Sequence, residues 1–174
     1  MSSEAKQRAF VDRLERHRGI LLKVANAYCR NPADRDDLVQ ETAAQLWRAY
    51  GRFDESASFA TWAYRVAVNV AISFHRSGRR RQQRVVPASE ASLESLPAPA
   101  AAEADDRLAL VREFIEGFDE LNRALMLLYL DDRPYAEIAA ILGITETNVA
   151  TKIARNKARL KRSIGLESHI DKEH

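Results

Sequence analysis

The sequence predicts an all-α protein made of two small helical domains joined by a flexible linker. Apolar residues recur at steps of three, four and seven over most of the chain, whereas the sustained alternation typical of strands is absent. Between Pro87 and Asp106 the composition changes to Ala, Ser and Pro with acidic residues and no Lys or Arg, which is typical of a linker. The 174 residues suffice for one domain or two small ones. We therefore expect domains at 1–84 and 107–174, with the linker at 85–106.

The N-terminal segment from Glu4 to Arg30 is predicted to form a long amphipathic helix, with Gly19 as the place where it could break. His17 falls on its apolar stripe, where a packed histidine is much commoner than a metal ligand. The single cysteine, Cys29, adjoins this stripe, and we expect it to be a buried small apolar residue. The stripe consists of Phe10, Leu14, Leu21, Val24 and Tyr28.

A second helix is predicted from Asp34 to about Tyr50, because Asn31 and Pro32 should end the first one. Asp34 would be its N-cap, with Asp37 as the capping-box partner. Its apolar side comprises Leu38, Val39, Ala43, Leu46 and Trp47. The other face carries the carboxylates of Asp34, Asp37 and Glu41, with Asp36 adjoining. Carboxylates in a first turn can simply satisfy the positive end of a helix. The alternative is an acidic docking face for a basic partner helix.

The third helix is predicted from Ser58 to Arg76, and it should pack on the first two. Its apolar positions are Trp62, Val66, Val70 and Phe74, flanked by Phe59 and Ala63. A run of cations without any acid follows: Arg76, Arg79, Arg80, Arg81 and Arg84. This run could be a solvated basic tail. Aromatic residues interleaved with arginine beside a polar helix face also suit a surface that binds single-stranded nucleic acid.

The last third of the chain predicts a helix-turn-helix. Helical spacing continues through Leu108, Val111, Phe114 and Phe118, through Leu121 to Leu130, and through Tyr135, Ile138, Ala139 and Leu142. Pro134 stands at the start of the first helix of the motif, where its missing N–H costs nothing. Gly143 breaks the pattern and Thr145 caps a second helix whose inward side is Val149, Ile153 and Leu160. A helical pair of this form is a common DNA-binding motif.

The outward face of that second helix carries short polar groups and cations. These residues are Thr147, Asn148, Thr151, Lys152 and Arg155. The segment from Gly143 to Arg162 contains six cationic residues and one acidic residue, Glu146, so its net charge is +5. Such a face can reach base edges and phosphates in a major groove. The plain alternative is a solvated basic face, because cations also suit the end of a helix.

Composition limits the remaining functions. The net charge of the whole chain is only +2, so any nucleic-acid binding must come from segregated patches. The four histidines lack metal-site spacing, and the chain shows neither a nucleophile with a paired base nor a phosphate-binding glycine loop. We therefore expect no enzyme, no metal and no cofactor. The charged N-terminus does not resemble a signal peptide, and no stretch is apolar enough for a membrane span, so we expect a cytoplasmic protein.

Several strings in this order resemble the extracytoplasmic-function (ECF, group IV) sigma factors of the sigma-70 family. The match extends over about residues 10 to 164. Asp34–Thr42 followed by Leu46-Trp47-Arg48 resembles region 2.2, and Phe59–Asn69 resembles regions 2.3 and 2.4. Leu121–Leu130 and Tyr135–Ile144 resemble region 4. Any one string would be suggestive, whereas all of them together in this order are highly specific.

The resemblance implies a dissociable subunit that binds core RNA polymerase, directs it to promoters and helps to open the duplex. The positions that match docking on the clamp helices of the largest polymerase subunit are Asp34, Asp36, Asp37, Leu38, Gln40 and Glu41. Those that match the surface for the minus-ten element, where a base is extruded, are Trp62, Arg65, Asn69, Arg76, Arg79, Arg80 and Arg81. Those that match reading of the minus-thirty-five element are Thr145, Thr147, Asn148, Thr151, Lys152 and Arg155.

The chain departs from the family pattern at two places. Pro134 replaces the common Ser or Thr before the Tyr of the first motif helix, and the order Thr147–Ile153 in the second helix is unusual for the family. The promoter sequence therefore cannot be copied from better-known members. The resemblance also implies an anti-sigma factor as a partner. The competing hypothesis is a helix-turn-helix regulator that binds operator DNA without polymerase, which would need a dimerising or ligand-sensing first domain.

Overall fold

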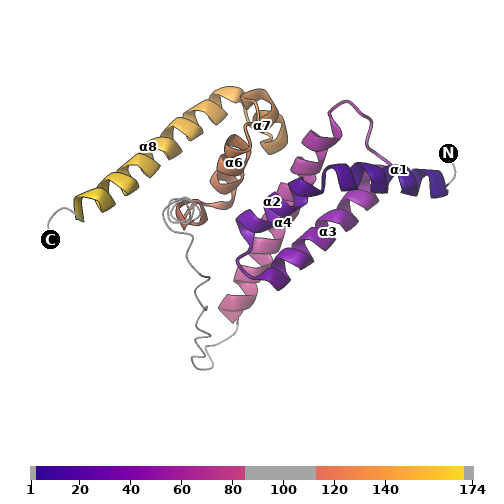
Figure 1. Cartoon of the computed structure of the whole chain (residues 1–174), viewed down its shortest axis with the longest axis horizontal. Helices are drawn as coiled ribbons and strands as arrows, with labels where there is room; N and C mark the ends of the chain where they lie inside the picture. The colour runs from indigo at the N-terminus through magenta and orange to yellow at the C-terminus, as the bar shows by residue number, and fades with distance from the viewer. Residues whose placement is uncertain (1–2, 85–112, 171–174) are drawn as a thin grey trace.

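The computed structural model of the chain describes residues 3–84 and 113–170, with side chains described for 3–78 and 113–163. All regular structure in these ranges is helical, as predicted (Figure 1). The helices with bounds inside these ranges are α1 (Ser3–Arg16), α2 (Arg18–Tyr28), α3 (Pro32–Tyr50), α4 (Phe59–Arg84), α6 (Glu120–Leu130), α7 (Tyr135–Leu142) and α8 (Glu146–Ile170), and residues 113–116 are helical as well. The predicted linker at 85–106 lies outside the described residues, as do Leu108, Val111 and the side chains of Arg79, Arg80, Arg81 and Arg84.

The N-terminal segment is two helices rather than one, and the break lies close to Gly19, where the sequence suggested that the helix could break. The chain leaves the helical conformation at His17, two residues before Gly19. His17 Nδ1 lies 2.8 Å from the backbone oxygen of Arg13, and its ring packs 5.0 Å from that of Phe59. His17 is therefore a packed residue, as expected, and Cys29 is buried and free.

The start of α3 also differs from the prediction. Asn31, not Asp34, is the N-cap: its side-chain oxygen accepts a hydrogen bond from the Ala33 amide at 2.8 Å, and Pro32 follows in the first turn. Asn31 and Pro32 are predicted to end the preceding helix, but an Asn cap followed by Pro is equally favourable at a helix start. Arg35 joins the two helices, donating from Nε to the Cys29 carbonyl at 2.9 Å and from Nη2 to the Arg30 carbonyl at 2.8 Å.

Helix α4 is the centre of the molecule. It is capped by Ser58, whose hydroxyl lies 3.1 Å from the Thr61 amide, and it extends eight residues beyond the predicted end at Arg76. The predicted stripe from Trp62 to Phe74 is only half-buried. The buried positions of this helix are Phe59 and Ala63, which the prediction placed beside the stripe, and four residues outside it: Tyr64, Ala67, Val68 and Ala71. The difference arises because α4 packs against α2 and α3 and also against α7 of the second half.

The second half contains the predicted helix-turn-helix. Gly143 ends α7 with φ +68°, a left-handed conformation that favours glycine. The Thr145 hydroxyl accepts a hydrogen bond from the Asn148 amide at 3.1 Å and so caps α8. Val149 and Ile153 are buried as expected, whereas Tyr135 is 39% exposed.

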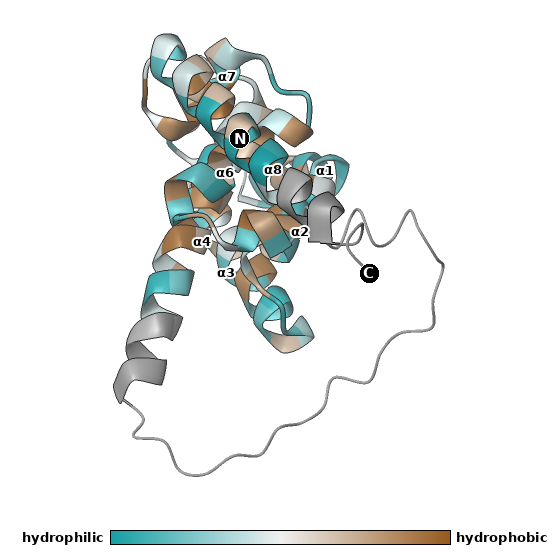
Figure 2. Ribbon diagram, turned by 90° about the vertical axis from the view of Figure 1, so that its left-hand side faces the viewer, coloured by the Kyte–Doolittle hydropathy of each residue, from teal (hydrophilic) through white to brown (hydrophobic). Residues whose placement is uncertain are grey.

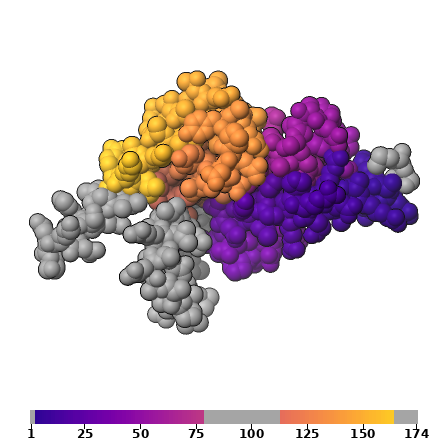
Figure 3. Space-filling model, turned by 45° about the horizontal axis from the view of Figure 1, so that its top comes forward, coloured from indigo at the N-terminus to yellow at the C-terminus, as the bar shows by residue number. Residues whose placement is uncertain are grey.

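The two halves pack against each other through α2 with α6 and α4 with α7. Figure 2 shows apolar and polar positions alternating around the helices, as amphipathic helices require. In the space-filling view of Figure 3 the orange and yellow atoms of the second half meet the indigo and magenta atoms of the first. Among the described residues, no helix is long and apolar enough to cross a membrane.

Candidate nucleic-acid and partner interfaces

The first turns of α3 present an acidic surface to solvent. Asp34, Asp36, Asp37 and Gln40 are exposed, whereas Leu38 is 1% exposed and supports the helix from the core. Within the described part of the chain, Asp36 and Asp37 have no side-chain partner. Two carboxylates on adjacent residues are thus available to a cationic partner.

Glu41 differs from those aspartates because neighbours on its own helix engage it. Gln45 Nε2 donates to Glu41 Oε1 at 2.8 Å, and Arg48 Nη1 lies 3.5 Å from the same oxygen. Its availability to a partner is therefore lower than sequence spacing suggested. Exposed pairs of this kind contribute little to stability.

Trp62 lies in a cluster of aromatic rings at the start of α4. Its ring centroid is 4.8 Å from that of Phe53 and 5.3 Å from that of Phe59. Phe53 belongs to the loop 51–58, which α1 holds in place: Arg13 donates to Glu55 at 2.5 Å and its guanidinium lies 5.7 Å from the Phe53 ring centroid. The role of this loop could not be predicted from the sequence, because pairing between residues so far apart in the chain leaves no local signal.

Asn69 faces an open hollow of about 420 Å³ between α3 and α4. Glu41 and Gln45 line it from α3, with Ser73 and Ser77 beside Asn69 on α4. Asn69 and Arg65 are exposed, and Arg76 Nε lies 3.9 Å from Glu120 Oε1 of the second half. The structure therefore brings Glu41 of the predicted polymerase set next to Asn69 of the predicted minus-ten set.

The outward face of α8 is accessible along its first three turns. Thr147, Asn148, Thr151 and Arg155 are exposed, and Lys152 is half-buried. Two hydroxyls are engaged: that of Thr145 caps the helix, and that of Thr151 donates to the Thr147 carbonyl at 2.9 Å. The side-chain amide of Asn148, unlike its backbone N–H, has no hydrogen-bond partner among the described residues, so it is free to pair with a base edge.

A buried asparagine on α8, Asn156, fixes the position of this helix against α6. Asn156, 7% exposed, donates from Nδ2 to Asn122 Oδ1 at 3.1 Å, and Asn122 in turn contacts the α6 cap Asp119. Farther along, Lys157 lies over the Tyr129 ring, at 5.6 Å from its centroid, and Arg159 lies over that of Phe118, at 5.2 Å. Those two cations therefore cover aromatic surface in addition to adding charge.

The described residues hold no group of three or more His, Cys, Asp or Glu side chains that could bind a metal ion. What the geometry offers is a set of exposed surfaces: an acidic turn on α3, an aromatic and polar face on α4 and loop 51–58, and a polar and cationic face on α8.

Two family models match the chain: sigma-70 region 2 over residues 14–81 and sigma-70 region 4 over residues 108–160. The ECF RNA polymerase sigma-E factor of Salmonella typhimurium strain LT2 is 33% identical over 154 residues, covering 82% of this chain and 81% of that protein.

Two solved structures share the fold. The sigma factor RpoE from Bartonella quintana, in complex with the anti-sigma factor NepR, has a TM-score of 0.71 at 21% identity, covering 91% of this chain and 98% of that one. CnrH in complex with the cytosolic domain of CnrY has a TM-score of 0.67 at 24% identity, covering 92% and 90%. The two matched regions stand in the order that the sequence strings predicted, and the chain therefore belongs to the ECF sigma factors of the sigma-70 family.

Proposed function

We propose that this chain binds core RNA polymerase, directs it to promoters and assists in opening the duplex. The observation that carries the proposal is the exposed polar and cationic face of α8, whose opposite face is buried in a helix-turn-helix. Helices presented in this way enter the major groove of DNA. The relatives are named as RNA polymerase sigma factors, which favours this function over that of an operator-binding regulator.

Each surface takes one part of this activity. Residues 1–84 bind polymerase through Asp34, Asp36, Asp37, Gln40 and Glu41, with Leu38 supporting them from inside. The same domain binds the minus-ten element through Trp62, Arg65, Asn69 and Arg76, together with Arg79, Arg80 and Arg81. Residues 85–106 link it to the second domain, 107–174, which reads the minus-thirty-five element through Thr147, Asn148, Thr151, Lys152 and Arg155, with Thr145 capping the helix.

The proposed activity is binding rather than catalysis, and it belongs in the cytoplasm, where polymerase and promoter DNA are found. A protein inhibitor is part of the proposal, because two relatives of the same fold have been solved with protein partners, one of them named as an anti-sigma factor.

Reconstitution with core polymerase tests the proposal directly. The purified chain should comigrate with core polymerase on gel filtration without DNA. The complex should also transcribe from a subset of fragments in a genomic library, whereas core polymerase alone should not. Retention of fragments by the chain alone, without any association with polymerase, would instead identify an operator-binding regulator.

The α8 face should separate into residues that read sequence and residues that bind phosphate. We expect Asn148→Ala to change the preferred minus-thirty-five sequence, because the free side-chain amide of Asn148 can pair with a base edge. Arg155→Ala should weaken binding to all sequences and reduce the salt slope by about one unit. Selection from a randomised element measures both effects. An unchanged preference for Asn148→Ala would exclude it as a reader.

A further inference from the structure

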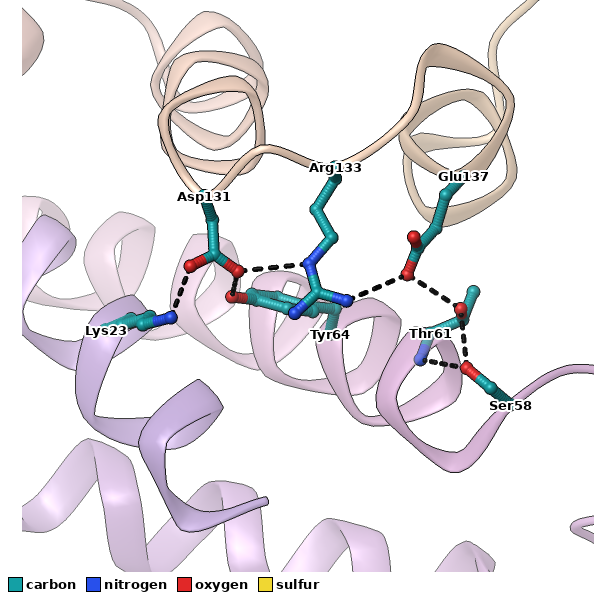
Figure 4. Close-up of polar contacts among 7 residues, drawn as sticks. All are labelled: Lys23, Ser58, Thr61, Tyr64, Asp131, Arg133 and Glu137. Atoms are coloured by element: carbon teal, nitrogen blue, oxygen red, sulfur yellow. Dashed lines mark hydrogen bonds and ion pairs between the residues drawn. The ribbon is translucent and has the colours of Figure 1, made fainter.

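The two helices of the helix-turn-helix are held in different ways, and polar contacts fix the first of them. Figure 4 shows the contacts around the start of α7. Arg133 Nη1 and Thr61 Oγ1 both donate to Glu137 Oε1, at 3.4 and 2.9 Å. The Asp131 carboxylate, just before α7, accepts hydrogen bonds from three residues: Lys23, Tyr64 and Arg133. The direction of α7 is therefore set by hydrogen bonds at its first turn.

The second helix of the motif, α8, is held mainly by apolar side chains. Its inward residues Val149 and Ile153 are buried. Apolar contacts have no preferred direction, so by themselves they permit a helix to rotate about its own axis. A hydrogen bond to a buried group would restrict that rotation, because its strength depends on angle and distance. In the part of α8 whose side chains the structure describes, the buried polar residue is Asn156.

Asn156 belongs to a chain of three hydrogen-bonded side chains whose orientation is set at one end. Asp119 is the N-cap of α6, and its ionised carboxylate can only accept hydrogen bonds. The Asn122 amide therefore turns its NH2 group toward Asp119, and Nδ2 donates to Oδ2 at 2.8 Å. The Asn122 oxygen then faces α8, where Asn156 Nδ2 donates to it at 3.1 Å. One carboxylate thus determines the orientation of both amides.

The charge of Asp119 also acts on α8 directly. Partial burial opposes ionisation of this carboxyl group, but hydrogen bonds from Asn122 and the positive charge of Lys152 hold the pKa of Asp119 below its ordinary value. Lys152 lies one turn before Asn156 and is half-buried. Asp119 therefore acts on two successive turns of α8. Lys152 is one of the residues proposed to read the minus-thirty-five element, so this network reaches the proposed DNA-binding face.

The network makes other rotations of α8 unfavourable. Asn156 is buried, so a rotation that separates it from Asn122 leaves its amide without a partner. A rotation of about 20° moves an atom on the outer surface of a helix, roughly 6 Å from the axis, by about 2 Å. Hydrogen-bond lengths vary by only about 0.5 Å. Such a rotation would therefore separate Asn148 from the base edge that it is proposed to contact.

We propose that Asn156 is a positioning residue for promoter recognition, which fixes the rotation of α8 by pairing with Asn122 and so determines which bases the outward face reads. The inference rests on the proposed function. A buried asparagine can act in this way in a coiled coil, where it fixes the register of the helices at a cost in stability. In α8 the apolar residues Val149 and Ile153 stabilise the packing, whereas the paired amides select one arrangement of it.

Replacing both amides with apolar side chains separates positioning from stability. Asn156→Leu alone leaves the Asn122 oxygen without this partner, whereas Asn122→Ala with Asn156→Leu removes both members, which costs little stability. Each full-length variant, in complex with core polymerase, should select a broader set of sequences from a randomised minus-thirty-five element. We expect the preference for the best base to fall about fivefold or more at one position at least. Affinity for unselected sequences should change by less than about twofold, because phosphate contacts carry little sequence information.

Ala158→Leu is the matched control. It adds the same side chain at an exposed position of α8, about 200° around the helix from Asn156, and should keep the wild-type preference. Circular dichroism should give the double variant a midpoint of thermal unfolding within about 2 °C of that of wild type.

A purely structural role for Asn156 predicts that the double variant, with its stability restored, regains the wild-type preference. That result would overturn the inference, as would a wild-type preference in both variants. Loss of preference only in variants that have also lost helical structure would overturn it too. A wild-type complex that selects no minus-thirty-five sequence would instead overturn the proposed function.

Discussion

Replacing both Asp36 and Asp37 with lysine is expected to weaken binding to core polymerase by about 100-fold, or about 2.7 kcal/mol. The change turns two free carboxylates of the proposed docking surface into cations facing a basic partner, and like charges across an interface cost several kcal/mol. The free energy of unfolding should change by less than about 0.5 kcal/mol, because both side chains are exposed. Fluorescence titration of labelled protein with core polymerase measures the affinity, and circular dichroism measures folding.

Asp12→Lys with Glu15→Lys provides the control for net charge. Both residues are exposed on α1 and, within the described ranges, make no side-chain ion pair. This variant should bind polymerase almost as wild type does. If both double variants lose affinity equally, the effect is general electrostatics and the α3 surface is not the docking site.

Asn69→Ala is expected to reduce open-complex formation on duplex promoters by about tenfold or more while leaving polymerase affinity unchanged. The exposed amide borders the hollow between α3 and α4, where it can donate to and accept from an unstacked base. Extrusion of a base costs a few kcal/mol that such contacts must offset. On templates already melted at the minus-ten element, the defect should shrink to about twofold, because the base pairs there are already broken and extrusion of the base needs less free energy.

Permanganate footprinting of both template types measures the effect. Ser73→Ala, one turn along α4 in the same hollow, is the control and should retain most of the activity. Equal activity of Asn69→Ala and wild type on duplex promoters would show that base capture does not depend on this amide.

Local signals predicted the helix-turn-helix well. Gly143 and Thr145 act on the backbone next to them, so their roles could be predicted from sequence without knowledge of the rest of the fold. The Asn31 cap was missed although it is equally local, because Asn followed by Pro suits both the end of one helix and the start of the next. A cap can therefore be recognised in the sequence, whereas whether it ends one helix or starts the next depends on packing.

The buried side of α4 could not be predicted in the same way. Trp62 and Val66 fit an amphipathic stripe, but Tyr64 and Val68 are the residues that are fully buried. Sequence periodicity can indicate that a helix has one apolar face. Helix α4 has two buried faces, because α2 and α3 cover one side and α7 of the second half covers another. The contacts of Asp131 were unpredictable for the same reason, since Lys23 and Tyr64 lie 108 and 67 residues away in the chain.

The corner between α2 and α3 holds the proposed polymerase-docking surface in a fixed conformation. Arg35 ties the carbonyls of Cys29 and Arg30 to α3, while Asn31 caps that helix. The acidic turn is therefore preorganised, and the proposed docking would lose little conformational entropy there. Asp36 and Asp37 approach a partner as charges at a fixed spacing on a rigid template. Selectivity of the proposed docking would then depend on that spacing, because a rigid turn cannot adjust to a cationic surface of a different shape.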